Sequence, residues 1–257
     1  MTDTSPAAVV DRRDDTLRAL VSSPATTTGL ADRLDVSRST ADRALRELAT
    51  HGFVAPGADG YRPTLAGRVA LTSHDQRARR IDGVADAATL FDGVNVGFDV
   101  DPAVFDGARV VEARPHAPNR PAECVVSLVS DATHVSVFST RFLPRHARVY
   151  HDRVCDGMTG SFVATESVLE RQRVARPDDQ PEGIDLGRVS FRRTDCDDPV
   201  TLVLAETPDG PVVGLVVYRD ETPRGFVGTD DPAATRWART RYERLWDAAT
   251  PLDYRRD

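Results

Sequence analysis

The chain has 257 residues, of which 40% are apolar and 28% charged, so it is long enough to bury a core in one large domain or two modest ones. Its longest apolar run, residues 212–218, is far too short to cross a bilayer, and its N-terminus has no apolar stretch of signal-peptide length. We therefore expect a cytoplasmic protein with no membrane partner. All 33 basic residues are arginine, which excludes Walker A loops, Schiff-base enzymes and kinase-type lysine chemistry.

Acidic residues dominate, with 31 aspartates, 9 glutamates and a net charge of −7. Such a lysine-free composition is typical of proteins from GC-rich, salt-loving organisms, whose acidic surfaces stay hydrated in concentrated salt; codon bias alone is the alternative explanation. The charge is uneven, because residues 1–80 hold 12 arginines against 10 acids and residues 81–257 hold 21 against 30. A relatively basic N-terminal part favours a nucleic-acid-binding head.

Three helices are predicted in the first fifty residues. Residues 8–22 carry apolar side chains at helical spacing, and the threonines at 26–28 offer N-caps for a second, short helix. Ser37 caps a third helix, which Gly52 ends. Two short helices joined by a tight turn, the second beginning Ser-Arg-Ser-Thr, are typical of a helix-turn-helix.

The polar face of the third helix suits DNA recognition. Arg38 and Arg43 lie opposite its apolar stripe, and an arginine binds guanine O6 and N7 through two hydrogen bonds. Hydroxyl groups near a helix N-terminus suit backbone phosphates. A protein-interaction domain with the same three helices remains the alternative. The predicted DNA-contacting residues are Ser37, Arg38, Ser39, Thr40, Arg43, Arg46 and Arg62.

A wing follows the third helix in the prediction. Short extended runs on either side of a Gly/Pro/Asp turn predict a β-hairpin, from which Arg62 reaches backbone phosphate. Thr64 then caps a fourth helix. The segments LADRL, SRST, LRELATHGFV and YRPTLAGR resemble the haloarchaeal-type winged-helix regulators common in archaea. The resemblance implies that Ser39, Thr40 and Arg43 contact DNA.

Beyond the N-terminal head, the spacing of the apolar residues along the chain changes. Residues 73–92 are predicted to form a helical linker or a dimerisation helix, and no repeat or low-complexity spacer follows. Valine-rich runs then predict strands, and longer amphipathic runs predict helices. The predicted strands are 94–100, 108–115, 123–129, 134–140, 160–165, 188–194, 200–206, 212–220 and 225–229, and the predicted helices are 143–158, 166–174 and 233–249.

These elements predict an α+β fold in three parts. A winged helix-turn-helix occupies residues 1–72, the linker helix residues 73–92, and an α/β sensor domain with a mixed sheet and packed helices residues 93–257. The segments SFVATESVLERQ and LVLAETPDGPVVGLVVYRDETPRGFVGTDDPAATRWARTRYERLWDAATPL resemble the effector domain of the archaeal methanogenesis-regulatory-protein family. The resemblance implies a signal-sensing domain distantly like phospholipase-D folds. Those enzymes use a His-x-Lys motif, so a lysine-free chain should lack their activity.

Metal and redox sites are weakly indicated. His151 and Cys155 lie four residues apart on one predicted helix, a spacing that binds metal, and His146 lies nearby. No third and fourth ligand has a matching spacing, so we interpret them as ordinary helix residues. Cys155 and Cys196 are candidate redox sensors, but the acidic surroundings of Cys196 disfavour a thiolate.

Two further motifs are incomplete. Ser161 lacks the second glycine of a Gly-x-Ser-x-Gly nucleophile elbow. The aspartates at 195–198 lack the glycine and glutamate of a calcium loop. We therefore expect no catalytic residue, no metal and no cofactor.

A small-molecule site is expected between the sheet and the helix ends of the second domain. Arginine there suits an anionic ligand, with surface ion pairing as the alternative role. The candidate effector-pocket residues are Arg141, Tyr150, Thr165 and Glu166.

The sequence thus predicts a sequence-specific transcription regulator that binds duplex DNA as a homodimer at half-sites about one helical turn apart. Its C-terminal domain is predicted to bind a small-molecule effector or a partner and to shift the dimer between competent and incompetent states. Two alternatives remain: a winged-helix interaction scaffold without DNA binding, and an enzyme with an unrecognised site in the α/β domain.

Overall fold

The computed structural model describes residues 5–94, 97, 99–174 and 187–252. The chain divides into two compact units, Met1–Arg79 and Arg80–Asp257. Helices and strands are mixed, and the larger sheet has both parallel and antiparallel strand pairs, which confirms the predicted α+β class with a mixed sheet. None of the helices in these ranges is long and apolar enough to span a membrane.

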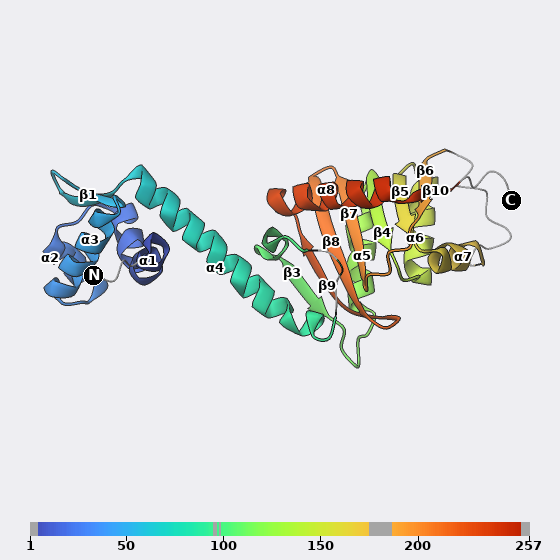
Figure 1. The fold of residues 1–257 in the computed structure, drawn as a ribbon, viewed down its shortest axis with the longest axis horizontal. Helices are drawn as coiled ribbons and strands as arrows, with labels where there is room; N and C mark the ends of the chain where they lie inside the picture. Colours follow the sequence, from blue (N-terminus) through green and yellow to red (C-terminus); the bar gives the residue numbers. More distant parts are fainter. Residues whose placement is uncertain (1–4, 95–96, 98, 175–186, 253–257) are drawn as a thin grey trace. The chain divides into compact units, whose positions relative to one another are not determined.

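The first unit contains three helices, a β-hairpin and the start of a fourth helix (Figure 1). Hydroxyl caps begin the helices, among them Thr26 Oγ1, which accepts from the Gly29 amide at 3.2 Å, Ser37 Oγ, which accepts from the Thr40 amide at 3.1 Å, and Thr64 Oγ1, which accepts from the Gly67 amide at 3.1 Å. These are the predicted caps. The elements are α1 (Pro6–Ser22), α2 (Thr27–Leu34), α3 (Arg38–Thr50), β1 (Val54–Gly57), β2 (Gly60–Pro63) and α4 (Leu65–Phe91), the last continuing into the second unit.

One apolar cluster holds the first unit together. Leu17 and Leu20 of α1, Leu30 of α2, and Leu45 and Leu48 of α3 are each at most 1% exposed. Burying a leucine contributes about 1.5–3 kcal/mol. Because these side chains recur at helical spacing, their burial decides which face of each helix turns inward.

The β1–β2 hairpin, which is the predicted wing, is held against the start of α2. Ala25 and Tyr61 exchange two backbone hydrogen bonds of 3.2 and 2.8 Å. Gly60 has a φ of +112°, and a Cβ there would overlap the backbone of Ala25. This corner therefore requires a glycine.

The second unit is built on a sheet of eight strands in the order β10-β6-β5-β4-β7-β8-β9-β3 (Figure 1). Strands β4, β5 and β6 run parallel, and their other neighbours pair antiparallel. The elements after α4 are η1 (Pro102–Phe105), β3 (Arg109–Glu112), α5 (Arg120–Ser130), β4 (His134–Ser139), α6 (Pro144–Cys155), β5 (Thr159–Ala164), α7 (Glu166–Val174), β6 (Val189–Arg193), β7 (Val200–Thr207), β8 (Gly210–Arg219), β9 (Thr222–Thr229), α8 (Pro232–Ala248) and β10 (Thr250–Pro251).

Helices cover both faces of this sheet. On one face, Leu202 and Leu204 of β7 pack in a cluster with α8, η1 and the end of α4. On the other face, Val203 and Ala205 of the same strand pack in a cluster with α5 and α6. Because successive side chains point to opposite faces, a strand buried on both sides is apolar throughout.

Residues 123–129, predicted as a strand, lie in helix α5. Pro121 occupies the first turn of this helix, where a missing amide costs nothing. Ala122, Val125 and Val129 follow at helical spacing and are buried. The strand prediction was wrong because a short valine-rich run does not distinguish a buried strand from a buried helix.

Residues 94–100 were also predicted as a strand. Positions 95, 96 and 98 lie outside the described residues, and positions 94, 97, 99 and 100 are not in a strand. The other predicted strands and helices of the second unit are confirmed to within a few residues. Boundaries are the part of such predictions that sequence patterns define least well.

An arginine side chain caps the C-terminal end of three helices. Arg33 caps α1, Arg188 caps α6 and Arg192 caps α8. In each case one guanidinium nitrogen donates to two backbone carbonyls at the helix end, at 2.6 to 3.5 Å. Arg192 also lies over the Trp246 ring, 4.5 Å from its centroid. A cation at a helix C-terminus is favourable, and the planar fork satisfies several acceptors at once.

Substitutions of Gly67 and Gly29 together test the close contact between α4 and Phe53, the residue before β1. A Cβ on Gly67 would overlap the Phe53 carbonyl oxygen, whereas a Cβ on Gly29 meets only Thr26 Oγ1 at 3.5 Å. We expect Gly67→Ala to lower the free energy of unfolding of the first unit by about 1–3 kcal/mol and Gly29→Ala to raise it by about 0.4–1 kcal/mol. Denaturant unfolding of the full chain measures both, and stabilisation by both substitutions would contradict the described contact.

Candidate functional site

Helix α3 buries one face and exposes the other. Ala41, Ala44, Leu45 and Leu48 are at most 2% exposed, and α1 and α2 pack against this side. The opposite side and the N-terminal end of the helix are open to solvent. Packing therefore fixes α3 with its polar face outward.

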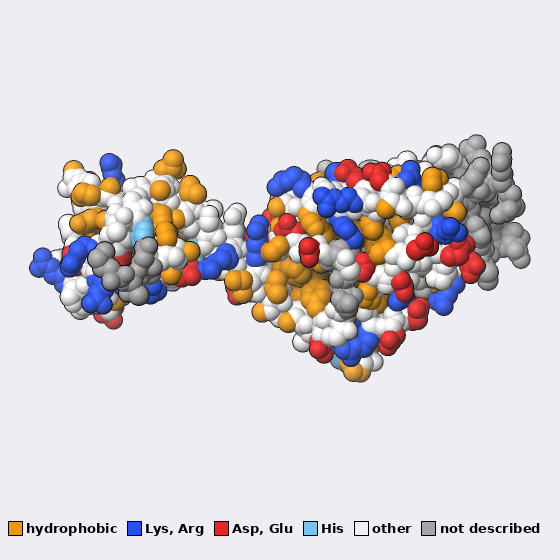
Figure 2. Space-filling model, viewed as in Figure 1, with side chains coloured by type: hydrophobic (Ala, Val, Ile, Leu, Met, Phe, Trp, Pro, Cys, Tyr) orange, Lys and Arg blue, Asp and Glu red, His pale blue; other side chains and the backbone are white. Residues whose placement is uncertain are grey.

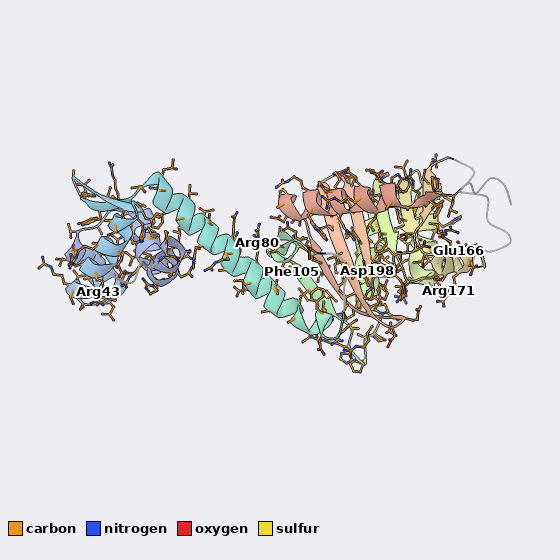
Figure 3. All side chains as sticks on the ribbon, in the orientation of Figure 1. Arg43, Arg80, Phe105, Glu166, Arg171 and Asp198 are labelled. Carbon is orange, nitrogen blue, oxygen red and sulfur yellow. The ribbon has the colours of Figure 1, made fainter. Side chains whose placement is uncertain are left out.

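Two arginines on that exposed face have no partner among the described residues. Arg38 and Arg43 are both exposed, and neither forms a hydrogen bond or ion pair with the residues that the structure describes. Arg43 lies at the edge of the first unit in Figure 3. Arg46, one turn further along, is ion-paired with Asp42. The free donors are thus at the N-terminal half of the helix.

Three hydroxyl groups lie together at the start of α3. Ser37 Oγ is 2.9 Å from Ser39 Oγ and 2.8 Å from Thr40 Oγ1, and all three residues are exposed. Arg62 is exposed on β2, a different element. The structure therefore brings six of the seven predicted DNA contacts onto one helix and its cap, and leaves the seventh on the wing.

An ion-pair cluster fixes α3 against α1. Glu47 Oε2 accepts a hydrogen bond from Arg13 Nε at 3.0 Å and lies 3.6 Å from an Arg12 guanidinium nitrogen. The hydrogen bond from Arg13 lowers the pKa of the Glu47 carboxyl. The cluster was not predicted, because only the helix packing brings residues 34 positions apart together.

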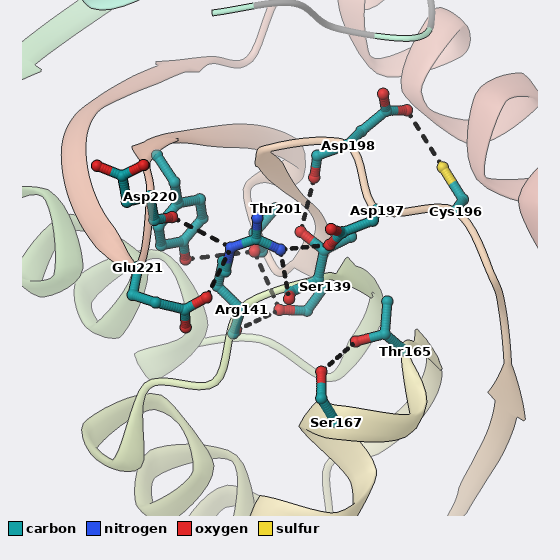
Figure 4. A network of polar contacts seen from close by, with 12 residues as sticks. Ser139, Arg141, Thr165, Ser167, Cys196, Asp197, Asp198, Thr201, Asp220 and Glu221 are labelled. Atoms are coloured by element: carbon teal, nitrogen blue, oxygen red, sulfur yellow. Dashed lines mark hydrogen bonds and ion pairs between the residues drawn. The ribbon is translucent and has the colours of Figure 1, made fainter.

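Arg141, a predicted effector contact, lies in a network of polar contacts after β4 (Figure 4). Its Nε donates to the Asp220 carbonyl at 3.1 Å and lies 3.4 Å from Glu221 Oε1. A second nitrogen donates to the Thr140 carbonyl at 3.0 Å and to the Asp197 carboxylate. The guanidinium therefore ties the β8–β9 turn and the segment before β7 to the end of β4, with the side chain only 15% exposed.

Glu166 is the first residue of α7, and Thr165, which is drawn in Figure 4, directly precedes it. Thr165 Oγ1 is 3.1 Å from Ser167 Oγ, and Glu166 accepts a hydrogen bond from Arg193 at 3.3 Å. These predicted site residues thus also have protein partners.

Tyr150, the fourth predicted effector contact, lies apart on α6. Its ring packs edge-on against Phe162, with centroids 5.3 Å apart. Its hydroxyl is buried without a hydrogen-bond partner in the described part of the chain, and burial raises its pKa. Burial likewise raises the pKa of Tyr218 to about 12, although that hydroxyl lies 3.3 Å from Thr201 Oγ1. Both phenol groups therefore stay protonated near neutral pH.

The weaker metal and redox candidates differ in their surroundings. Cys155 Sγ and His151 Nε2 are 3.6 Å apart on one helix face, but the described residues contain no group of three or more potential metal ligands. Burial lowers the pKa of His146 to about 4, and its Nε2 lies 3.0 Å from the Ala122 carbonyl oxygen. Burial also raises the pKa of Cys196, whose thiol donates to Asp198 at 3.2 Å, so this thiol is poorly suited to redox sensing.

Two cavities open on the second unit. One, of about 820 Å³, lies between α8 and a segment that contributes Gly97, Asp99 and Asp101. The other, of about 750 Å³, lies between the C-terminal half of α5 and the sheet end formed by β3, β7, β8 and β9. Neither is lined by the four residues predicted for an effector pocket. The sequence analysis missed the second cavity, since its lining residues come from α5 and four strands that only the tertiary structure brings together.

Two family models match the chain. The middle domain of the methanogenesis regulatory protein FilR1 matches residues 118–248, just over half of the chain. The HVO_A0261 N-terminal domain matches residues 1–85. No match was found among curated proteins.

Several solved structures are similar to this chain. TrmBL2, an archaeal chromatin protein with a novel mode of DNA binding, is 15% identical over 95% of this chain and 94% of its own, with a TM-score of 0.44. A phospholipase D family member, NUC from Salmonella typhimurium, is 12% identical over 56% and 98%, with a TM-score of 0.39. An IclR homolog from Microbacterium sp. strain HM58-2 is 13% identical over 93% and 98%, with a TM-score of 0.27.

The Glu47 cluster makes the stability of the first unit depend on pH. Because the folded-state pKa of Glu47 is lowered, its contribution is present above the unfolded-state pKa and is lost as pH falls through the folded-state value. Glu47→Gln should therefore destabilise the first unit near neutral pH by about 1 kcal/mol or less, and the difference from the parent should vanish in acid. Asp42→Asn removes a carboxylate that pairs only with the exposed Arg46 and should change little. Thermal unfolding across pH checks this, and equal behaviour of the two variants would refute it.

Proposed function

We propose that this chain, which belongs to the family of the methanogenesis regulatory protein FilR1 middle domain, is a transcription regulator that binds duplex DNA through α3. The observation that carries the proposal is the pair of exposed, unpartnered guanidinium groups of Arg38 and Arg43 among the described residues. On a recognition helix, residues at the N-terminal end meet base edges in the major groove. Arginine there binds guanine through two hydrogen bonds.

The surrounding residues have positioning roles in this proposal. The exposed hydroxyls of Ser37, Ser39 and Thr40 lie at a helix N-terminus, where phosphate oxygens are favoured. Arg62 on the wing contacts a phosphate. Arg46 is paired with Asp42, so it contributes less until that pair opens.

The net negative charge of the chain and the small positive charge of residues 1–80 affect which contacts supply the affinity for DNA. Counterion release from phosphate contacts weakens steeply with salt. In the concentrated salt that the composition indicates, charges are screened within a few ångströms. Base contacts and DNA shape then carry more of the affinity than phosphate contacts.

The regulator is proposed to act in the cytoplasm as a homodimer joined through α4 of the second unit. Ile81 and Val84 are exposed apolar residues on this segment, 58% and 42% exposed. Large apolar side chains exposed together mark interaction surfaces. The second unit is proposed to bind a small-molecule effector, which shifts the dimer between DNA-binding and non-binding states.

Arg38→Ala and Arg43→Ala should each weaken binding to the operator about 5- to 150-fold, the equivalent of about 1–3 kcal/mol per contact. The operator comes from a genome-wide pull-down of DNA fragments, and affinity is then measured on the enriched duplex. Arg62→Ala should weaken binding to all sequences alike and reduce the salt slope by about one. Arg68→Ala, which removes an exposed arginine from α4, is the matched control and should leave affinity unchanged.

A parent protein that binds no duplex, while circular dichroism shows it folded, would contradict the regulator and favour the interaction scaffold. Loss of affinity on Arg68→Ala equal to that on Arg43→Ala would indicate charge alone. Hydrolysis or group transfer by the parent protein would favour the enzyme alternative.

The dimer proposal has its own test. Replacing Ile81 and Val84 together by Asp should convert a dimer into a monomer in sedimentation experiments, because burying unpaired charge opposes association. The control is the double substitution of the exposed, polar Thr72 and Ser73 by Asp on the same helix. A monomeric parent, or equal masses for both double variants, would overturn the proposal.

A further inference from the structure

We propose that the second unit binds a nucleoside phosphate in the cavity of about 820 Å³ beside α8. The inference deepens the proposed effector role by naming the chemical class of the ligand, and it rests on that role for its regulatory meaning. Ligand binding is measured without DNA, so its failure is distinguishable from failure of the DNA-binding proposal.

Helix α8 forms one wall of this cavity with two rows of side chains. Arg236, Thr240 and Arg244 follow one another at intervals of four residues, and all three are exposed. Ala233 and Trp237, on the adjacent row, are half-buried. Because residues four apart lie on the same side of a helix, the outer row of this wall is polar and basic, whereas the inner row offers an alanine and an aromatic ring.

The outer row presents two guanidinium groups to a ligand. Neither Arg236 nor Arg244 forms a hydrogen bond or ion pair with the described residues, and Figure 2 shows basic side chains gathered where α8 lies in Figure 1. Eight residues of helix rise about 12 Å, and Thr240 lies midway. Arginines bind phosphate oxygens through paired hydrogen bonds, so a phosphate over the Thr240 hydroxyl meets both. The exposed acids of this helix, Glu243 and Asp247, do not line the cavity.

The two aspartates of the described lining come from a different segment. Asp99 and Asp101 precede η1, whereas Arg241 and the other two lining arginines all come from α8. Asp101 accepts a hydrogen bond from the Ala103 amide at 2.8 Å, and neither aspartate forms an ion pair with a described residue. The lining therefore suits a ligand that offers an anion to α8 and hydrogen-bond donors to the carboxylates.

Trp237 adds a preference for a flat ring. It lines the cavity and also packs against the apolar cluster beneath α8, so the fold holds the indole in place. Nucleic-acid bases stack on such aromatic side chains. Ala233, one turn earlier, has only a methyl group and leaves room beside the ring. The volume of the cavity is within the range of about 300–1,000 Å³ that is typical of small-molecule sites.

A nucleoside phosphate carries all three groups that this lining suits. Its phosphate would meet Arg236 and Arg244, and its base would stack on Trp237. Its sugar hydroxyls would donate to Asp99 and Asp101, as ribose hydroxyls do to acidic residues in nucleotide sites. An aromatic amino acid offers a carboxylate, an ammonium group and a ring instead. Two arginines flanking a hydroxyl favour a phosphate, which has three terminal oxygens, over a carboxylate, which has two.

The test is calorimetric titration of the full chain with adenosine 5′-monophosphate (AMP), with adenosine and with phenylalanine, in salt at which circular dichroism shows the chain folded. AMP should bind, and adenosine and phenylalanine should each bind at least tenfold more weakly. Arg236→Gln and Arg244→Gln should each weaken AMP binding at least fivefold and change adenosine binding little. Thr240→Glu places a carboxylate four residues from each arginine, a spacing that stabilises a helix. It should weaken AMP binding at least tenfold with no loss of thermal stability.

Two control variants match these substitutions. Thr240→Gln changes the same position without adding a charge, and Arg239→Gln removes an exposed arginine of α8 that pairs with Glu206 and does not line the cavity. Both should bind AMP within threefold of the parent. The proposal is overturned if AMP does not bind, if adenosine or phenylalanine binds as tightly as AMP, or if the loss in Arg236→Gln equals that in Arg239→Gln.

Discussion

The orientation of α3 is the constraint on which the proposed DNA interface depends. One stripe of small and branched apolar residues, from Ala41 to Leu48, is buried against α1 and α2. A helix with one apolar stripe has only one way to bury it, so the remaining residues are placed outward. The Ser37 cap fixes where the helix begins, and the Glu47 ion pairs fix it against α1. The apolar stripe and the Glu47 ion pairs therefore hold the interface without themselves touching DNA, whereas Ser37 both caps the helix and belongs to the proposed interface.

In the second unit, burial of apolar side chains covers both faces of the sheet. A sheet buried on both faces needs continuous apolar strands, which β7 and β8 provide. A cavity opens beside Phe226 of β9, between α5 and the end of the sheet. Its lining includes the ion-paired Arg153 as well as Arg109, which has no ion pair among the described residues. The Arg141 guanidinium lies outside this cavity and has several protein partners.

The absence of lysine has structural consequences beyond codon usage. Arg33, Arg188 and Arg192 each donate to two carbonyls at a helix end, a geometry that the compact lysine ammonium matches less well. Many of the arginines are ion-paired or capping, but several others, such as Arg62 and Arg68, also have no side-chain partner among the described residues. Arg38 and Arg43 are set apart by their place on the exposed face of α3.

Local signals in the sequence were sufficient for the first unit, because caps, helical spacing and a turn-rich hairpin all act within a few residues, as at Thr26, Ser37 and Gly60. They were insufficient at residues 123–129, where valine-rich sequence suits helix and strand alike, and only Pro121 and the packing of α5 on the sheet decide. Partners distant in the chain, such as Arg13 with Glu47 or Gly214 with Gly228, depend on tertiary packing and strand register. Whether an arginine side chain has protein partners depends on the residues that the fold brings close to it. Only the tertiary structure therefore distinguishes Arg43, which has no partner among the described residues, from Arg141, which has several.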